Sequence, residues 1–376
     1  MEVTHKQLKQ LLRKGYEAKV PIDVKGAMGI GKSEIIQDTA IQIASEEKRK
    51  FVFWNRISEE EKEGLLTADL DKVFIYSDIR LAQMDQTDLK GFPNTKADYA
   101  KWVPTLLFKI LSRDTAVGMI FFDEMNTSAP SVMASAYSIV NDHLIGETPI
   151  SYGIFIVSAG NGLEHSNNVF EDPAPLNNRR CNVVLNPPIV RSDDGEDWTT
   201  WASAHDVDAR IIGYLNAYET KIFKYEEENK DPSFPTPRSW ARLSNFIRGI
   251  KDSNLIKMYA GSLIGEGIAR EFTAFINLSE KVNIREILKK PELMKRYQGE
   301  DQLDIKYSIV SGIAELYSKE GKILNEAMGL CPYMEPEFSM FMLKMMKGMH
   351  KGDYSKALTS CPNWKNIAGD FAKYVL

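Results

Sequence analysis

Eight consecutive residues have the types and the spacing of a phosphate-binding loop. The pattern G-x-x-x-x-G-K-[ST] is matched at every fixed position by Gly26, Ala27, Met28, Gly29, Ile30, Gly31, Lys32 and Ser33. The glycines allow backbone N–H groups to turn towards a phosphate, and a helix that starts here adds the positive end of its dipole. Lys32 can then pair with the β- and γ-phosphates of a nucleotide, while the Ser33 hydroxyl binds Mg²⁺.

The residues around this loop supply the context that the chemistry needs. Residues 20–24 are a short β-branched run that predicts a strand. Ile36, Ala40 and Ile43 recur at helical spacing, so Ser33 is expected to open a helix. A glycine-rich turn can match the pattern by chance, but the strand before it and the helix after it favour a nucleotide-binding loop.

Two carboxylates directly follow the apolar run 119–122, which predicts a strand buried on both faces. In a parallel sheet, ligands bind beyond the carboxyl ends of the strands, where the phosphate loop also lies. There Asp123 can hold the Mg²⁺ shell, and Glu124 can polarise a water for attack on the γ-phosphate. Considered alone, the two residues indicate only an acidic pair at a strand end; the loop upstream favours the catalytic interpretation.

An asparagine follows the next apolar run. Residues 154–157 predict another core strand, and Asn161 ends the Ser-Ala-Gly-Asn sequence after it. Its amide could orient the attacking water without competing for the proton of that water. An asparagine before Gly162 is equally a common turn former. The order of the motifs favours the first interpretation.

Length and composition limit the class of protein. A chain of 376 residues is expected to form two or three domains, and a net charge of −5 argues against nucleic acid as the main ligand. The three cysteines, Cys181, Cys331 and Cys361, are widely spaced, which suits a reducing compartment and predicts no metal cluster. The N-terminus is polar and the apolar runs are only strand-sized, so we expect a cytoplasmic protein with no membrane span.

The patterns divide the chain into an α/β part and a helical part. Strand and helix patterns alternate up to about residue 190, which predicts a mostly parallel sheet with helices on both faces. After Pro187-Pro188, helical patterns dominate. We expect an α/β nucleotide-binding core over 1–190, a helical lid over 191–290 and a helical C-terminal extension over 291–376.

The order of the motifs resembles that of AAA+ ATPases, and more narrowly of the MoxR-type group. The resemblance rests on the phosphate loop, on Phe-Phe-Asp-Glu-Met-Asn (121–126), on Ser-Ala-Gly-Asn (158–161), on Leu-Asn-Asn-Arg-Arg (176–180) and on Pro-Arg-Ser (237–239). It covers residues 20–190 and the region near 238, and it fades beyond about residue 290. It implies that Asn161 is sensor 1, that Arg179 or Arg180 is the arginine finger, and that Arg238 is sensor 2.

A physical reason supports an arginine finger independently of the resemblance. Hydrolysis places negative charge on the γ-phosphoryl oxygens. A guanidinium that contacts these oxygens only in the transition state stabilises it selectively, with an effect of roughly 10³–10⁵ in rate. Arg179 is favoured because Asn178-Arg179 matches the usual step in the group. The alternative is a basic turn that pairs with Glu171 or Asp172.

The resemblance also implies a function. It predicts Mg²⁺-dependent ATP hydrolysis by a homo-oligomeric ring, a hexamer, coupled to remodelling of a protein partner, and partners of this group commonly carry a von Willebrand factor A domain. Residues 80–93 and 102–104 stand where the group has its helix-2 insertion, which could touch a client or simply fold onto the sheet. The alternatives are a nucleotide-gated assembly module with incidental turnover and a DNA-directed motor.

Overall fold

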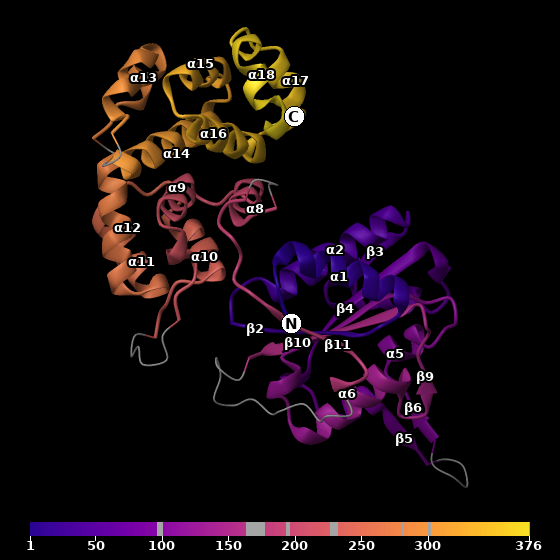
Figure 1. Ribbon diagram of the computed structural model, residues 1–376. Coiled ribbons are helices and arrows are strands. Elements are labelled where there is room, and N and C mark those ends of the chain that lie inside the picture. Colours follow the sequence, from indigo (N-terminus) through magenta and orange to yellow (C-terminus); the bar gives the residue numbers. More distant parts are fainter. Residues whose placement is uncertain are drawn as a thin grey trace. The chain divides into compact units, whose positions relative to one another are not determined.

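The computed structural model describes residues 1–95, 101–162, 177–192, 196–225, 232–279, 281–299 and 302–375. The chain divides into two compact units, Met1–Pro187 and Pro188–Leu376 (Figure 1). A further division near residue 290 stays a prediction. Within the described part of the chain, no helix combines the length and the apolar character needed to cross a membrane.

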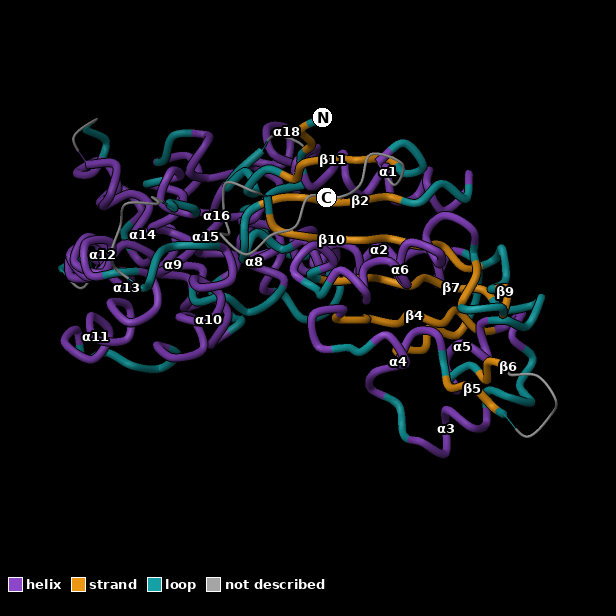
Figure 2. The backbone as a smooth tube through the Cα atoms, turned by 90° about the horizontal axis from the view of Figure 1, so that it is seen from below, coloured by secondary structure: helices purple, strands orange, loops and turns teal. Residues whose placement is uncertain are grey.

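The first unit is built on a seven-stranded sheet in the order β1-β11-β2-β10-β7-β4-β3, and all neighbouring strands in it are parallel. Figure 2 shows β11, β2, β10, β7 and β4 side by side in this order. The strands are β1 (Glu2–Val3), β2 (Ile22–Gly26), β3 (Lys50–Phe53), β4 (Val73–Arg80), β7 (Val117–Asp123), β10 (Ile154–Asn161) and β11 (Cys181–Leu185). The middle strands β7 and β10 are mostly apolar because both of their faces are covered, and their polar residues lie towards their carboxyl ends.

Helices cover both faces of this sheet (Figure 1). On one face lie α1 and α2, and the α1 side chain of Tyr16 contacts the rings of Phe74 and Phe155. On the other face, α6 packs its Val132, Ala136 and Ile139 into a core with alternate residues of β4, β7 and β10. The helices of this unit are α1 (His5–Ala18), α2 (Lys32–Glu46), α3 (Glu59–Gly64), α4 (Gln86–Lys90), α5 (Leu106–Leu111) and α6 (Pro130–Asp142).

The segment predicted as an insertion forms a small substructure after β4. It contains α4 and an antiparallel hairpin of β5 (Phe92–Asn94) with β6 (Lys101–Val103). Leu89 is buried, whereas Phe92 is 60% exposed. The segment is therefore partly packed onto the unit and partly open to solvent. A second short hairpin pairs β8 (Leu144–Ile145) with β9 (Thr148–Pro149).

All regular secondary structure among the described residues of the second unit is helical, and it surrounds one apolar core with members from Val190 to Val375. Trp240 is fully buried there, and its Nε1–H donates to the carbonyl of Lys221 at 2.9 Å. The α-helices are α8 (Trp198–Ala204), α9 (Ala209–Ala217), α10 (Pro237–Ile247), α11 (Ser253–Ile264), α12 (Glu266–Ser279), α13 (Ile284–Lys289), α14 (Leu303–Glu320), α15 (Leu324–Leu330), α16 (Pro336–Met349), α17 (Tyr354–Thr359) and α18 (Trp364–Val375). The predicted fold class, a parallel α/β core followed by an all-α region, is confirmed.

Candidate nucleotide-binding site

The phosphate loop joins β2 to α2, as its pattern requires. Gly31 has a φ of 95°, in the left-handed region that favours glycine. At Gly26 an added Cβ would lie 2.7 Å from the carbonyl oxygen of Leu185, so the loop has no room for a side chain there. The Lys32 ammonium is buried and donates to the carbonyls of Gly26 and Ala27, both at 2.8 Å, and to Asn161 Oδ1 at 3.3 Å.

The pairing of the strands brings the other predicted residues to this loop. Asn161 is paired with Gly26 across β10 and β2, and Asp123 ends β7 at the same carboxyl edge of the sheet. The Ser33 hydroxyl donates to Asp123 Oδ2 at 3.1 Å. A hydroxyl and a carboxylate oxygen this close form the kind of hard oxygen donor set that Mg²⁺ prefers, so these residues fit the ion.

Glu124 has an unusual backbone for its residue type. Its φ is 54° and its side chain is exposed at the edge of the sheet. Its backbone N–H donates to the carboxylate of Asp123 at 3.0 Å. A non-glycine residue in the left-handed region costs about 1–3 kcal/mol, and such strain occurs mostly at functional sites. The turn therefore separates the two carboxylates, with Asp123 towards Ser33 and Glu124 towards solvent.

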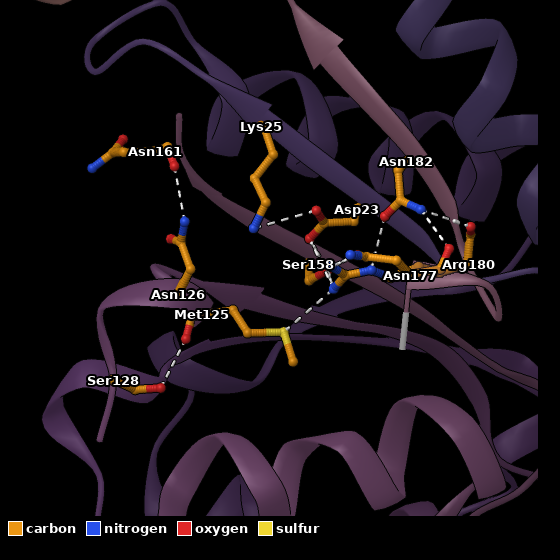
Figure 3. Close-up of polar contacts among 10 residues, drawn as sticks. All are labelled: Asp23, Lys25, Met125, Asn126, Ser128, Ser158, Asn161, Asn177, Arg180 and Asn182. Atoms are coloured by element: carbon orange, nitrogen blue, oxygen red, sulfur yellow. Dashed lines mark hydrogen bonds and ion pairs between the residues drawn. The ribbon is translucent and has the colours of Figure 1, made fainter. Parts of the chain in front are cut away.

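The buried amide of Asn126 fixes the position of Asn161. The sequence alone assigned no role to Asn126. Asn126 is 2% exposed, and its Nδ2–H donates to the carbonyl of Asn161 at 2.8 Å (Figure 3). Gly160 leaves room for this amide, since an added Cβ would lie 2.2 Å from Asn126 Oδ1. Gly160 and Asn161 thus both depend on Asn126, which precedes Asn161 by 35 positions, and no local pattern reveals this dependence.

We expect Gly160→Ala to displace Asn126 and break its bond to Asn161. Such overpacking typically costs about 1–3 kcal/mol. The melting temperature should therefore fall. Gly64→Ala is the matched control, because nothing lies within 4 Å of a Cβ at that position. A Gly160→Ala variant with the melting temperature of the control would contradict the tight fit.

Two further titratable groups lie beside the site. Burial raises the pKa of Asp78, near the carboxyl end of β4, and the negative charge of Asp123 raises it further. One oxygen of this carboxyl, Oδ1, is buried without a hydrogen-bond partner in the described structure. On the other side of the loop, His5 Nε2 bonds the carbonyl of Ile30 at 2.8 Å, and burial lowers the pKa of this histidine. A neutral His5 with its proton on Nε2 can donate that bond, which ties α1 to the phosphate loop.

The two adjacent arginines have opposite surroundings. The side chain of Arg179 is 55% exposed and lies 3.4 Å from Asp142. That of Arg180 is 1% exposed and forms an ion pair with the equally buried Asp23 at 3.2 Å (Figure 3). Only Arg179 therefore presents its guanidinium to solvent. The proposed alternative partners, Glu171 and Asp172, lie outside the described residues.

Both arginines lie at the end of the sheet opposite to the phosphate loop. The strand after them, β11, runs parallel to β2, with Cys181 paired to Ile22 and Leu185 to Gly26. Four residues of strand at about 3.3 Å each thus separate the level of Cys181 from that of Gly26. Arg179 comes before Cys181, so it is still farther from the loop of its own chain.

Arg238 belongs to the second unit. It is an exposed residue in the first turn of α10, directly after Pro237. Thr236 and Ser239 form a capping box around this turn, and Trp240 anchors the helix in the core. The helix start is therefore well defined, and it holds the guanidinium outside the core.

Comparisons with known proteins give only distant structural similarity. No protein-family model matches the sequence, and no curated protein matches it. A RuvB mutant from Thermotoga maritima is 14% identical, with a TM-score of 0.30 over 79% of this chain and 78% of that chain. A putative ATPase from Cytophaga hutchinsonii is 11% identical, with a TM-score of 0.30 over 99% and 89%. NtrX from Brucella abortus in complex with ATP is 13% identical, with a TM-score of 0.34 over 92% and 67%. These scores are low, so the fold is described from the structure itself: a parallel α/β sheet with the phosphate loop between β2 and α2, which is the arrangement of a P-loop NTPase, followed by a helical unit.

Proposed function

We propose that this chain is an Mg²⁺-dependent ATPase of the MoxR-like AAA+ type, which acts as a homo-oligomeric ring and remodels a protein partner. The observation that carries the proposal is the contact of Ser33 with Asp123 at 3.1 Å, directly beside the phosphate loop. A glycine-rich turn without nucleotide chemistry would not need a strand-end carboxylate at that hydroxyl. The ring of six and the partner with a von Willebrand factor A domain come from the resemblance of the sequence.

Each residue of the site has a role in this proposal. The N–H groups of the loop and the ammonium of Lys32 bind the phosphates of ATP, and Lys32 can exchange its bonds to the loop carbonyls for phosphate oxygens. Ser33 and Asp123 hold Mg²⁺, which neutralises charge on the phosphates when it is bound. Glu124 accepts the proton of the attacking water. Asn161, held by Asn126, orients that water as sensor 1.

The arginine finger is Arg179, and it acts on a neighbouring subunit. Its side chain is exposed, whereas that of Arg180 is buried in an ion pair. The pairing of β11 with β2 keeps Arg179 away from the phosphate loop of its own chain. The guanidinium that stabilises the γ-phosphate in the transition state must then come from a second copy of this chain. Turnover therefore depends on assembly. Arg238, as sensor 2, reports the state of the nucleotide to the helical unit.

The experiment that tests this function is a measurement of ATP turnover by the purified chain. We expect hydrolysis that is abolished when Mg²⁺ is chelated and that rises more than linearly with protein concentration. Single-stranded or duplex DNA should leave the rate unchanged. Stimulation by DNA would favour a DNA-directed motor instead, and the absence of turnover at any concentration would favour a nucleotide-gated assembly module.

Removal of the Lys32 ammonium should abolish nucleotide binding, since Lys32 is the only cationic side chain between Gly26 and Ser33. The Lys32→Ala variant can be titrated with a fluorescent ATP analogue. Lys14→Ala is a suitable control, because that lysine is 78% exposed on α1. If Lys32→Ala bound the analogue as tightly as the control, the loop would not be the nucleotide site.

A further inference from the structure

Arg180 closes the turn that carries Arg179. Its Nε–H donates to Asn182 Oδ1 at 2.9 Å, and its Nη2–H donates to Asn177 Oδ1 at 3.0 Å. The Asn182 amide in turn donates to the carbonyl of Asn177 at 2.7 Å. The planar guanidinium thus joins residues on both sides of Arg179, so the backbone between them is fixed from within (Figure 3).

The same guanidinium attaches this turn to the centre of the sheet. Its Nη1 lies 3.2 Å from Asp23 Oδ1 on β2 and 3.5 Å from Ser158 Oγ on β10. Ser158 donates to the same oxygen of Asp23 at 2.5 Å, and Lys25 Nζ lies 3.4 Å from the other one. Asp23 therefore organises a buried polar cluster below the turn, and Figure 3 shows that its members come from different strands.

The cluster also reaches the segment that follows the catalytic carboxylates. Arg180 Nη1 lies 4.0 Å from the sulfur of Met125, the residue after Glu124. Met125 is fully buried. One guanidinium thus contacts both the Arg179 turn and the segment behind Glu124.

Stability alone does not explain a buried ion pair at this place. Removing two charges from water costs several kcal/mol per ion, and apolar residues of similar volume often stabilise a protein equally well. What an arginine adds is a rigid fork of donors with a fixed direction. Here the fork has one arm on Asp23 of β2, one on Asn182 of β11 and one on Asn177 in the turn.

We propose that Arg180 is a positioning residue: held by Asp23, it joins the turn at Asn177 to Asn182 on β11 and thereby directs Arg179 towards the nucleotide of a neighbouring subunit. This inference rests on the proposed role of Arg179 as the finger. It assigns to the second arginine a role distinct from the first, since the two share neither exposure nor partners.

The test uses Arg180→Lys, which keeps a cation for Asp23 but loses the fork to the two asparagines. We expect kcat to fall about ten- to a hundredfold, because small displacements of a catalytic group are costly. The affinity for an ATP analogue should not change. In an Arg179→Ala background the same substitution should cause no further loss of kcat, since a residue that acts only through Arg179 has nothing left to position.

Arg113→Lys is the matched control for the loss of a guanidinium. Arg113 lies before β7, at the end of the strand away from Asp123, and holds the carbonyls of Leu65, Leu66 and Ala68 at 2.9–3.1 Å. Its replacement should lower the melting temperature and leave kcat unchanged. If Arg180→Lys does not fold, Asn182→Ala removes one arm of the fork at an exposed residue and should lower kcat by a smaller factor.

The outcomes separate this inference from the proposed function. An Arg179→Ala variant with wild-type kcat would reject the finger, and the positioning role with it. An inactive Arg179→Ala variant beside a fully active Arg180→Lys variant would reject only the positioning role. Losses that multiply in the double variant would also reject it, because Arg180 would then act independently of Arg179.

Discussion

Glu124→Gln should bind ATP as the wild type does, while its turnover falls by roughly 10²–10⁴. Glutamine preserves the size of the side chain and its hydrogen bonding but cannot accept the proton of the attacking water. The side chain is exposed and outside the core, so the fold should not change. Binding of a fluorescent analogue and single-turnover hydrolysis by the same preparation would measure the two effects separately.

The neighbouring carboxylate provides the contrast for this experiment. Asp123 contacts Ser33, so Asp123→Asn should weaken the dependence on Mg²⁺ rather than remove the base. A titration of turnover against Mg²⁺ distinguishes the two variants. Hydrolysis by Glu124→Gln at the wild-type rate would show that Glu124 is not the base, and a Glu124→Gln variant with a shifted Mg²⁺ titration would assign Glu124 to the metal.

The sequence was sufficient to predict the centre of the sheet and the position of the phosphate loop. Apolar runs such as 117–122 and 154–157 have the short length and the β-branched and aromatic content that are typical of a buried strand. The predicted strand that ends before Ser158 continues to Asn161, because its ladder with β2 extends to Gly26. Asn161 is therefore the last residue of a strand rather than part of the turn after it.

The edge strands could not be predicted in this way. Residues 50–53 lie between charged segments and form β3 only because they pair with the start of β4. Similarly, β1 has only two residues, and they pair with β11, which lies near the end of the first unit in sequence. Pairing over such distances leaves no periodic pattern in the sequence.

The step Asn178-Arg179 favoured Arg179 in the sequence, but the burial of Arg180 was not visible there. Only the position of Asp23 on β2 shows which side chain is turned inward. Asn126 is a similar case, since its role depends on contact with Asn161 across two strands. Buried polar contacts of this kind depend on tertiary structure.

A mixture of two inactive variants should recover ATP turnover if the active site is shared between subunits. Arg179→Ala keeps an intact phosphate loop, and its own turnover should be lower by roughly 10³–10⁵. Lys32→Ala lacks the loop cation but keeps the finger. When the two are mixed, some interfaces join an intact loop to an intact finger, so activity should be highest near equal amounts of the two variants.

The reason for expecting recovery is the geometry of a single chain. Arg179 lies at the amino end of β11 and the phosphate loop at the carboxyl end of β2, and these strands are parallel neighbours. One chain therefore cannot bring the two groups together without breaking its sheet. Light scattering with ATP present must show that both variants still associate, because a failure to assemble would also abolish activity. If both variants assemble and no mixing ratio restores turnover, the finger does not act between subunits, and a self-contained nucleotide switch becomes the better explanation of this fold.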